Sequence, residues 1–408
     1  MNFDQLAPLA ERRLKTGDKA TLEERKSSLH ALSTQGLVNV IPGDIYKFTN
    51  VGKFLEEVSY EPRNNPVELD QILDDRIPTL IFIDGDLQNP DLKVKGLTTS
   101  LLSEKTVSPL HALSTLHQGL RSDGVRIDVK KNEVIESPIR ILNLMSRAGV
   151  VAPTIVVHAG ENSKLTLIEE NIAQDEAYAL SSETHVHVAR GAKVEHLHLE
   201  KGKAQSVHHG VTVAHLDQDS TYRNFVFHIS GKLNRRNVIM NVRAPGAHGE
   251  SYNLYLTNGE EQSDIYTEIQ HLCADTTSQQ LAKGILDGSS KGIFTGKIHI
   301  HKDAQRVNSG QLNKNLLLSK KAQAHSQPQL EIFADDVKCS HGSTTGQLSP
   351  EEVFYFESRG IPLEKAKTLL AHGFGLEVVL KIENPIAREI ASTLVMETLE
   401  TKFNLGGK

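Results

Sequence analysis

The sequence predicts a mainly β protein: a core of repeated short strands, with helical domains before and after it. Two observations in the central region of the 408-residue chain predict the core. Apolar and polar residues alternate there in short runs, which is typical of half-buried strands, and the runs recur at a nearly constant interval. A third observation is the helical periodicity on both sides. We therefore expect an N-terminal helical or α/β domain at 1–120, a β core at 121–347 and a C-terminal helical domain at 348–408.

The N-terminal zone carries one helix signal and one strand signal. Thr21 and Glu24 have capping-box spacing, in which each side chain accepts a hydrogen bond from the other residue's backbone N–H. Gly36 marks the expected end of that helix. Thr79–Ile83 is an apolar cluster followed by Asp84 and Gly85, which predicts a short buried strand ending in a turn.

The central zone contains the repeat. Leu165 aligns with Val194, and Val194 aligns with Tyr222, at offsets of 29 (194 − 165) and 28 (222 − 194) residues. A unit of this size without a helix cannot bury its apolar face alone. The apolar face can be buried either in the stacked coils of a β-helix or between the two sheets of a β-sandwich. The alternating runs are 164–168, 185–188, 194–199, 225–229, 252–256 and 297–301.

The C-terminal zone predicts three helices. Ser349 and Pro350 suit the N-cap and first helical position of the first, Pro362 opens the second, and Asn384 with Pro385 opens the third. Because an open coil exposes strand edges at its ends, helical zones here can act as caps or as docking modules.

Composition narrows the classes of function. Lys and Arg total 45 against 51 Asp and Glu, so the net charge of −6 argues against nucleic acid as the main partner. The apolar runs are too short for a membrane helix, and the first residues lack a secretory signal pattern, so we expect a cytoplasmic protein. Two cysteines exclude a disulfide scaffold and a self-contained four-cysteine metal site.

Several patterns could carry chemistry. Gly292–Lys297 resembles a phosphate-binding loop but has three residues between its glycines and no Ser or Thr after the Lys, so we expect no nucleotide hydrolysis by this chain. Three His-x-His pairs place two rings on one face of a strand, as in cupin metal sites, although the Glu of the cupin motif is missing. We expect their apolar neighbours to face the core and the histidines to face solvent. The pairs are His185/His187, His196/His198 and His299/His301.

The cysteines differ in their surroundings. Cys273 fits a buried small apolar residue. Cys339 lies two residues before His341, so the thiol and the imidazole would share one face of a strand. Lys338 and a protonated His341 would lower the thiol pKa. Sulfur and nitrogen donors together suit iron, copper or zinc, but they form only half a coordination shell, so further ligands would come from elsewhere, such as another chain.

The segment Gln327–Pro362, with Cys339-Ser-His-Gly342 inside it, closely resembles the hallmark of the SufB/SufD family of iron–sulfur cluster assembly scaffolds. Cys339-Ser-His-Gly342 is the form typical of the SufD branch. Tyr46–Thr49 departs from the pattern usual in that branch. Further similarity covers Gln280–Gly288, Gly292–Gln305 and Asn313–Ser319.

The resemblance implies a right-handed parallel β-helix core flanked by helical terminal domains. It implies a scaffold rather than an enzyme, paired with a SufB-like subunit through the β-helix and bound to a SufC-like ATPase through the C-terminal helices. Cys339 and His341 would hold iron or a transient iron–sulfur cluster at the subunit interface, and the isolated chain could form a homodimer. Flavin is associated with the family's complex, although no flavin motif is present. The residues expected to dock the ATPase are Phe354, Phe356, Leu369, Leu370 and Phe374.

Three other functions remain open from the sequence. A β-helical polysaccharide enzyme is disfavoured by the absence of Trp and of a secretory signal. A cytoplasmic cupin-like metal-binding enzyme would use one of the His-x-His pairs. A purely structural partner subunit would keep the complex but give Cys339 and His341 no chemical role.

Overall fold

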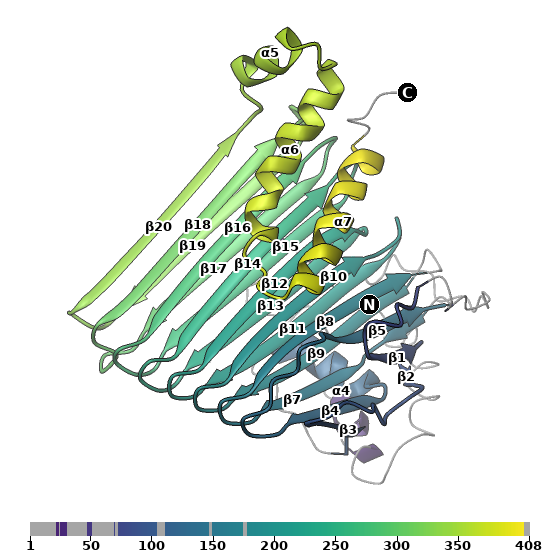
Figure 1. Cartoon of the computed structure of the whole chain (residues 1–408), viewed down its shortest axis with the longest axis vertical. Coiled ribbons are helices and arrows are strands. Elements are labelled where there is room, and N and C mark those ends of the chain that lie inside the picture. Colours follow the sequence, from purple (N-terminus) through teal and green to yellow (C-terminus); the bar gives the residue numbers. More distant parts are fainter. Residues whose placement is uncertain are drawn as a thin grey trace.

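A computed structural model describes residues 22–23, 25–30, 47–50, 69, 72–103, 111–146, 149–173 and 178–403. Its core is a parallel β-solenoid in which the chain passes alternately through two sheets (Figure 1). Sheet A contains β1 (Thr79–Ile83), β2 (Asp86–Leu87), β5 (Ile139–Met145), β8 (Lys164–Ala173), β10 (Lys193–Lys201), β12 (Thr221–Ser230), β14 (His248–Thr257), β16 (Thr277–Leu286), β18 (Val307–Leu317) and β20 (Val337–Gly346). Sheet B contains β3 (Leu97–Leu101), β4 (Gly124–Val129), β6 (Gly149–Val151), β7 (Thr154–Ala159), β9 (Tyr178–Val188), β11 (Val207–Leu216), β13 (Leu233–Val242), β15 (Gln262–His271), β17 (Lys291–Ile300) and β19 (Gln323–Ile332).

The strand register confirms the repeat. Val194 pairs with Leu165 on one side and with Tyr222 on the other, as the offsets of 29 and 28 residues predict. Tyr222 pairs in turn with Gly249. All these pairings are parallel, so the β-sandwich alternative is wrong and the mainly β, coiled architecture is confirmed.

The interior of the solenoid is divided lengthwise into an apolar half and a polar half. Near the turns that lead from sheet B to sheet A, inward-facing residues such as Val188, Leu216 and Val242 form a dry core with Leu165 and Val194. Towards the opposite turns, the inward-facing residues of β8, β10, β11 and β13 are polar and fully buried. They are Glu169, Asn171, His196, His198, Glu200, His208, Thr212, Asn234 and Arg236.

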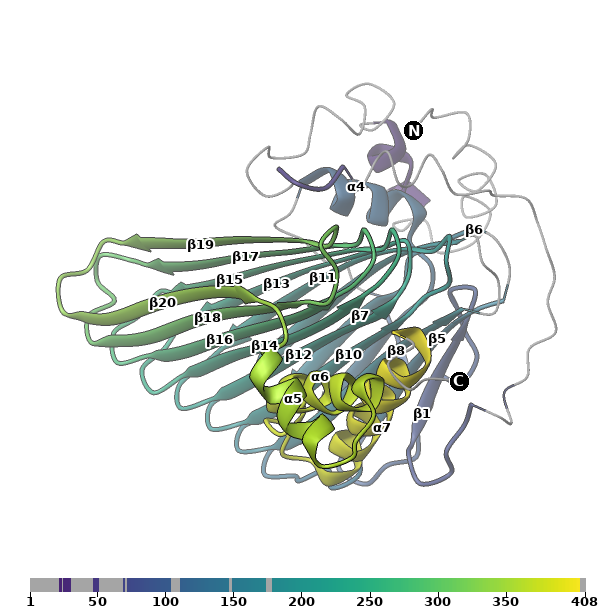
Figure 2. The same ribbon diagram turned by 90° about the horizontal axis from the view of Figure 1, so that it is seen from above.

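Helices cover both outer faces. Helices α6 (Leu363–Val379) and α7 (Pro385–Lys402) pack on sheet A over a second apolar cluster that includes Leu197, Phe227 and Leu254 (Figure 2). Helix α4 (His111–Leu120) lies on the side of sheet B, where the His117 ring bonds the carbonyl of Ser181. Helix α5 (Pro350–Ser358) follows β20 and has no buried residue.

Several local predictions are confirmed. β1 spans Thr79–Ile83, and Ser349 and Asn384 cap α5 and α7 through their side chains. β1 pairs with β5, and β3 pairs with β4, so part of the predicted N-terminal domain belongs to the sheets of the solenoid. Residues 25–30 are helical, whereas Gly36 and Tyr46 lie outside the described residues. Within the ranges given above, no helix has both the length and the apolar character needed to cross a bilayer.

Candidate functional site

Cys339 and His341 lie on β20, which is the last strand of sheet A. Cys339 pairs with Ser309 and His341 with Gln311, whose side chains both point into the solenoid. Residues two apart on a strand share a face, so Cys339 and His341 also point towards the interior at its open end. Cys339 is half-buried against a small apolar cluster that contains Ile298 and Val307, and His341 is exposed.

The outer edge of this end of the solenoid has no strand partner among the described residues. β20 ends sheet A and β19 ends sheet B, and each is ten residues long. Such an edge presents a row of backbone N–H and C=O groups that can pair with another strand. The sulfur and nitrogen donors therefore lie on the edge strand that ends sheet A.

The electrostatics of Cys339 differ from the sequence-based expectation. Burial raises the pKa of the Cys339 thiol above its usual value, and the hydrogen bond from the backbone of Ser309 only partly opposes this. Lys338 is adjacent in sequence, but successive side chains on a strand point to opposite faces. The expected lowering of the thiol pKa by Lys338 and His341 is therefore wrong for the isolated chain.

His341 is the last member of a polar column that runs along the interior of sheet A. Each member pairs in the strand register with the next member, which lies on the neighbouring strand of sheet A. In order from the open end, the column contains His341, Gln311, Gln280, Ser251, Asn224 and His196. All members except His341 are buried, so the site at the open end continues inward as a line of polar side chains.

The expectation that all His-x-His pairs face solvent is wrong for His196 and His198. Both rings are fully buried, and their centroids lie 4.0 Å apart. Leu197 and Leu199 instead face outward, under the C-terminal helices. Glu169 completes a cluster of three possible metal ligands with these histidines.

The other two pairs lie on the outer face of sheet B, as expected, although all four histidines are half-buried there. Val186 and Val188 are in the core, while His187 contacts Asp217 with Nε2 and Oδ2 2.8 Å apart. Ile298 and Ile300 are likewise buried, and His299 contacts Glu331 on the outside of sheet B. Cys273 is half-buried in the turn after β15 rather than in a core.

The polar interior around Glu200 is the part that the sequence patterns did not reveal. Glu200 accepts hydrogen bonds from Arg236 and His208 across the two sheets, and Asn171 also donates to it. Burial raises the pKa of Glu200, but Arg236 and His208 outweigh burial and hold this pKa well below its usual value. Gly210 lies beneath the Arg236 guanidinium, where any side chain would collide with it.

The residues predicted to dock an ATPase divide into exposed and packed ones. Phe354 on α5 is 69% exposed and Leu369 on α6 is 37% exposed. Phe356 and Leu370 are half-buried. Phe374 packs against the cluster under α6, with the Lys283 ammonium 3.9 Å from its ring centroid.

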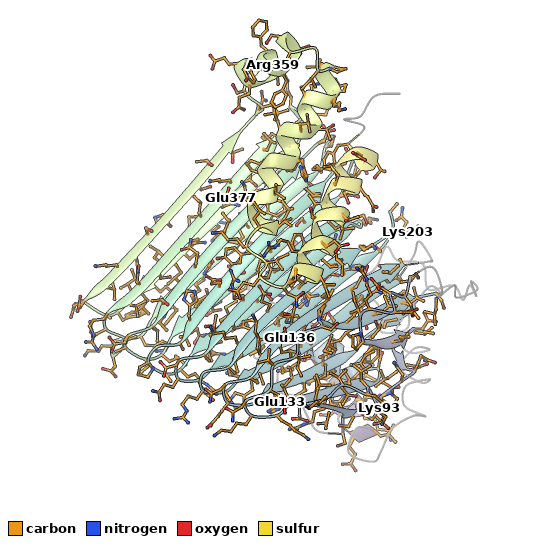
Figure 3. All side chains as sticks on the ribbon, in the orientation of Figure 1. Lys93, Glu133, Glu136, Lys203, Arg359 and Glu377 are labelled. Atoms are coloured by element: carbon orange, nitrogen blue, oxygen red, sulfur yellow. The ribbon has the colours of Figure 1, made fainter. Side chains whose placement is uncertain are left out.

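Helices α5 and α6 differ in their attachment to the solenoid. Figure 3 places Arg359, at the end of α5, beyond the strand ends, and Glu377 of α6 over sheet A. Glu377 forms ion pairs with Lys283 and Lys314 of the sheet. Helix α6 is therefore fixed to sheet A, whereas α5 has no buried residue and lies beyond the strand ends (Figure 3).

Comparison with known proteins places the chain in a family. Residues 142–374, more than half of the chain, match the SufBD core domain of SUF system FeS cluster assembly. The chain belongs to the SufB/SufD family. It is 29% identical over 365 residues to "Protein ABCI7, chloroplastic" of Arabidopsis thaliana, covering 83% of this chain and 77% of the relative. It is 27% identical over 314 residues to "Iron-sulfur cluster assembly protein SufD" of Escherichia coli, covering 73% and 74% of the two chains.

A second bacterial relative agrees with this assignment. The Bacillus subtilis protein named "Iron-sulfur cluster assembly protein SufD" is 27% identical over 298 residues, which cover 70% of this chain and 66% of the relative. The matched core, residues 142–374, contains the polar column, Cys339 and His341, and the exposed part of α5. Involvement of this SufB/SufD family member with iron–sulfur clusters follows from the family.

Proposed function

We propose that this chain is a non-catalytic, SufD-like scaffold subunit that acts in the cytoplasm with a SufB-like scaffold and a SufC-like ATPase. In this role it contributes to iron acquisition and to the assembly of new clusters. The observation that carries the proposal is the position of Cys339 and His341 on the edge strand β20, facing the open end of the solenoid. Membership of the SufB/SufD family supports the same role.

The partner at the open end is a SufB-like subunit. Two open edges, β19 and β20, lie side by side there, so a second parallel solenoid extends both sheets at once by strand addition. Right-handed winding of both solenoids, the usual hand for parallel strand crossovers, keeps the two stacks in register. In isolation, the same edges give a homodimer.

Iron and the growing cluster are cargo at this interface. Cys339 and His341 supply one sulfur and one nitrogen donor, and the SufB-like subunit supplies the remaining ligands. Burial raises the pKa of the Cys339 thiol, so this cysteine stays protonated until a metal ion displaces the proton. The chain therefore holds iron firmly only when its partner is present.

ATP hydrolysis belongs to the SufC-like partner, which docks on α5 and α6 through Phe354, Phe356, Leu369, Leu370 and Phe374. The exposure of Phe354 and Leu369, and the projection of α5 beyond the sheets, support this docking surface. Movement of the docked ATPase would be transmitted through α5, which directly follows β20. Flavin binding by the complex is a further expectation from the family resemblance.

The test compares cluster assembly by the purified three-subunit complex with and without the His341 side chain. We expect His341→Ala to reduce cluster formation, measured as acid-labile sulfide and iron per complex, because half of this chain's donor pair is lost. Ser343→Ala is the matched control, since Ser343 shares the face of β20 and is exposed. Undiminished cluster yield in a complex of normal composition would leave His341 without a chemical role and favour the purely structural subunit.

A further inference from the structure

The buried cluster of Glu169, His196 and His198 lies in the interior, separate from the open end. We propose that these three residues bind one divalent first-row transition-metal ion of the Zn²⁺ and Fe²⁺ class, as a structural site inside the solenoid. Two imidazoles and one carboxylate form a ligand set that suits both ions. The site is distinct from the Cys339 and His341 pair, which lies on β20 at the end of the stack.

Glu169 contacts each of the two histidines, and the distance between Glu169 and His198 fits two metal ligands better than a hydrogen bond. Nδ1 of His198 lies 3.5 Å from Oε2 of Glu169, beyond the usual range of an N–H···O bond. Ligands about 2.0–2.2 Å from a tetrahedral metal lie about 3.4 Å from one another. Nε2 of His196 lies 2.8 Å from Oε1 of Glu169, and one donor atom from each of the three residues lies within 4.8 Å of the others.

Nε2 of His198 lies 3.1 Å from Oδ1 of Asn224 and 3.3 Å from the hydroxyl of Thr212, and both oxygens can accept a hydrogen bond. We assign the ring proton to Nε2 on these contacts, which leaves a lone pair on Nδ1. This lone pair faces the carboxylate of Glu169. Neither Nδ1 of His198 nor Oε2 of Glu169 has a hydrogen-bond partner among the described residues, although both are buried. A cation between them would satisfy both atoms.

Each ligand is also oriented by a second group, as metal ligands usually are. The hydroxyl of Tyr222 lies 2.9 Å from Nδ1 of His196. The hydroxyl of Thr184 donates to Oε1 of Glu169 over 2.6 Å. These contacts fix the ring of His196 and one oxygen of Glu169, and they come from neighbouring strands of both sheets.

The charge balance of the interior points the same way. Glu200, which also faces the interior, contacts the guanidinium of Arg236, and two carboxylates buried on the outer faces of the sheets, Glu170 and Asp264, contact Arg140 and Arg235. Glu169 is fully buried, and its only ion-pair partners in the described part of the chain are His196 and His198. A buried carboxylate without a permanent cation beside it is costly, and a divalent ion would supply the positive charge that arginine supplies to the other buried carboxylates.

The ion would link successive coils of the solenoid. Glu169 comes from β8 and both histidines come from β10, so the ion would tie together two adjacent strands of sheet A. All three side chains are fully buried, so no substrate from solvent could reach the ion, and we assign it a structural role. Because the site is closed, the ion would enter as the chain folds, and a chelator would not remove it from the folded protein.

The experiment measures metal content in the full chain, expressed without a polyhistidine tag and refolded anaerobically with Zn²⁺, Fe²⁺ or Co²⁺. We expect one ion per chain to survive dialysis against EDTA, and most of it to be lost in Glu169→Gln and His198→Gln. His187→Gln is the matched control, because His187 belongs to a His-x-His pair on the outer face and should leave the content unchanged. Cys339→Ser with His341→Ala should also retain the ion, which separates this site from the cluster interface.

A spectroscopic measurement covers the case in which the buried variants do not fold. X-ray absorption of the wild-type chain loaded with Co²⁺ should show two imidazole ligands and carboxylate oxygen, and no sulfur. A wild-type chain that retains no EDTA-resistant ion after refolding with any of the three metals would overturn the proposal, and a proton shared by His198 and Glu169 would then replace the metal. A bound ion without imidazole ligands would overturn it equally.

Discussion

Cys339 shows how the reactivity of a residue depends on which face of a strand it occupies. Its side chain packs against the cluster around Val307, while Lys338 points to the other face of β20. Burial raises the thiol pKa, so little thiolate is present at neutral pH. A thiol that is mostly protonated at neutral pH reacts slowly with electrophiles, because the thiolate is the nucleophile.

We therefore predict slow alkylation of Cys339 in the isolated chain. The pH dependence of its reaction with iodoacetamide should have a midpoint above that of an ordinary thiol, about 8.5. The measurement is mass spectrometry of the Cys273→Ser variant, so that the signal comes from Cys339 alone. Urea-unfolded protein is the control and should show the ordinary midpoint. A midpoint below that of the unfolded protein would show that Lys338 and His341 control the thiol after all.

The position of His196 and His198 could not be predicted because both faces of their strand are buried. In β10, His196 and His198 alternate with Leu197 and Leu199, and apolar residues usually mark the core side. Here the leucines pack under α6 and α7, and the histidines point into the polar half of the interior. Alternation gives the period of a strand, but it identifies the inner face only when the other face meets water.

At the scale of elements, the helix α7 is held at its N-terminus by its own N-cap and by contacts with distant parts of the chain. Asn384 accepts hydrogen bonds from the backbone N–H groups of Ile386 and Ala387 and donates to the carbonyl of Glu136. Glu195 of β10 accepts from the backbone N–H groups of Glu383 and Asn384, at 2.7 and 2.9 Å. These contacts fix the helix to the solenoid.

We predict that Asn384→Ala weakens the attachment of α7. The loss of an N-cap costs about 1 kcal/mol, and here a contact with Glu136 is lost as well. Hydrogen exchange of the α7 amides should become about fivefold faster or more, because 1.4 kcal/mol corresponds to about tenfold. Ser349→Ala, at the cap of the fully unburied α5, is the control and should leave α7 unchanged. Equal exchange in wild type and Asn384→Ala would show that packing alone holds α7.

Caps and repeats were predictable because local chemistry determines them. Ser349, Asn384 and the register of Leu165 with Val194 follow from residue type and spacing. The contacts of Glu195 with α7 and of Glu200 with Arg236 join residues far apart in the sequence, so no spacing rule reveals them. The edge position of Cys339 and His341 came from the family resemblance, because the sequence pattern of a strand does not show whether it ends a sheet.

At the scale of the whole molecule, buried histidines make the stability of the fold depend on pH. Burial lowers the pKa of His209 and of His228 to about 3, and that of His271 to about 4. In the unfolded chain each imidazole titrates near 6.5. Between these values the unfolded state binds a proton that the folded state does not, so stability falls as the pH decreases below about 6.5. Each histidine contributes up to about 1.4 kcal/mol per pH unit in this window.

We predict that the urea midpoint of unfolding decreases from pH 7.5 to pH 5, a range in which ordinary carboxylates remain ionised. Carboxylates add to the effect only at lower pH. Burial raises the pKa of Glu250, but hydrogen bonds from His248 and Arg223 outweigh burial and hold this pKa at about 2. The stability that Glu250 contributes is therefore lost only as the pH falls below about 4.5. In His271→Gln, the urea midpoint should decrease less between pH 6.5 and pH 5, by the amount that one histidine contributes, because glutamine does not titrate. The glutamine side chain can still form a hydrogen bond with Thr276 or Ser278. The unfolding is measured by the fluorescence of the buried tyrosines in urea at four pH values. A urea midpoint that is constant across this range would mean that the buried imidazoles take up protons while the protein stays folded.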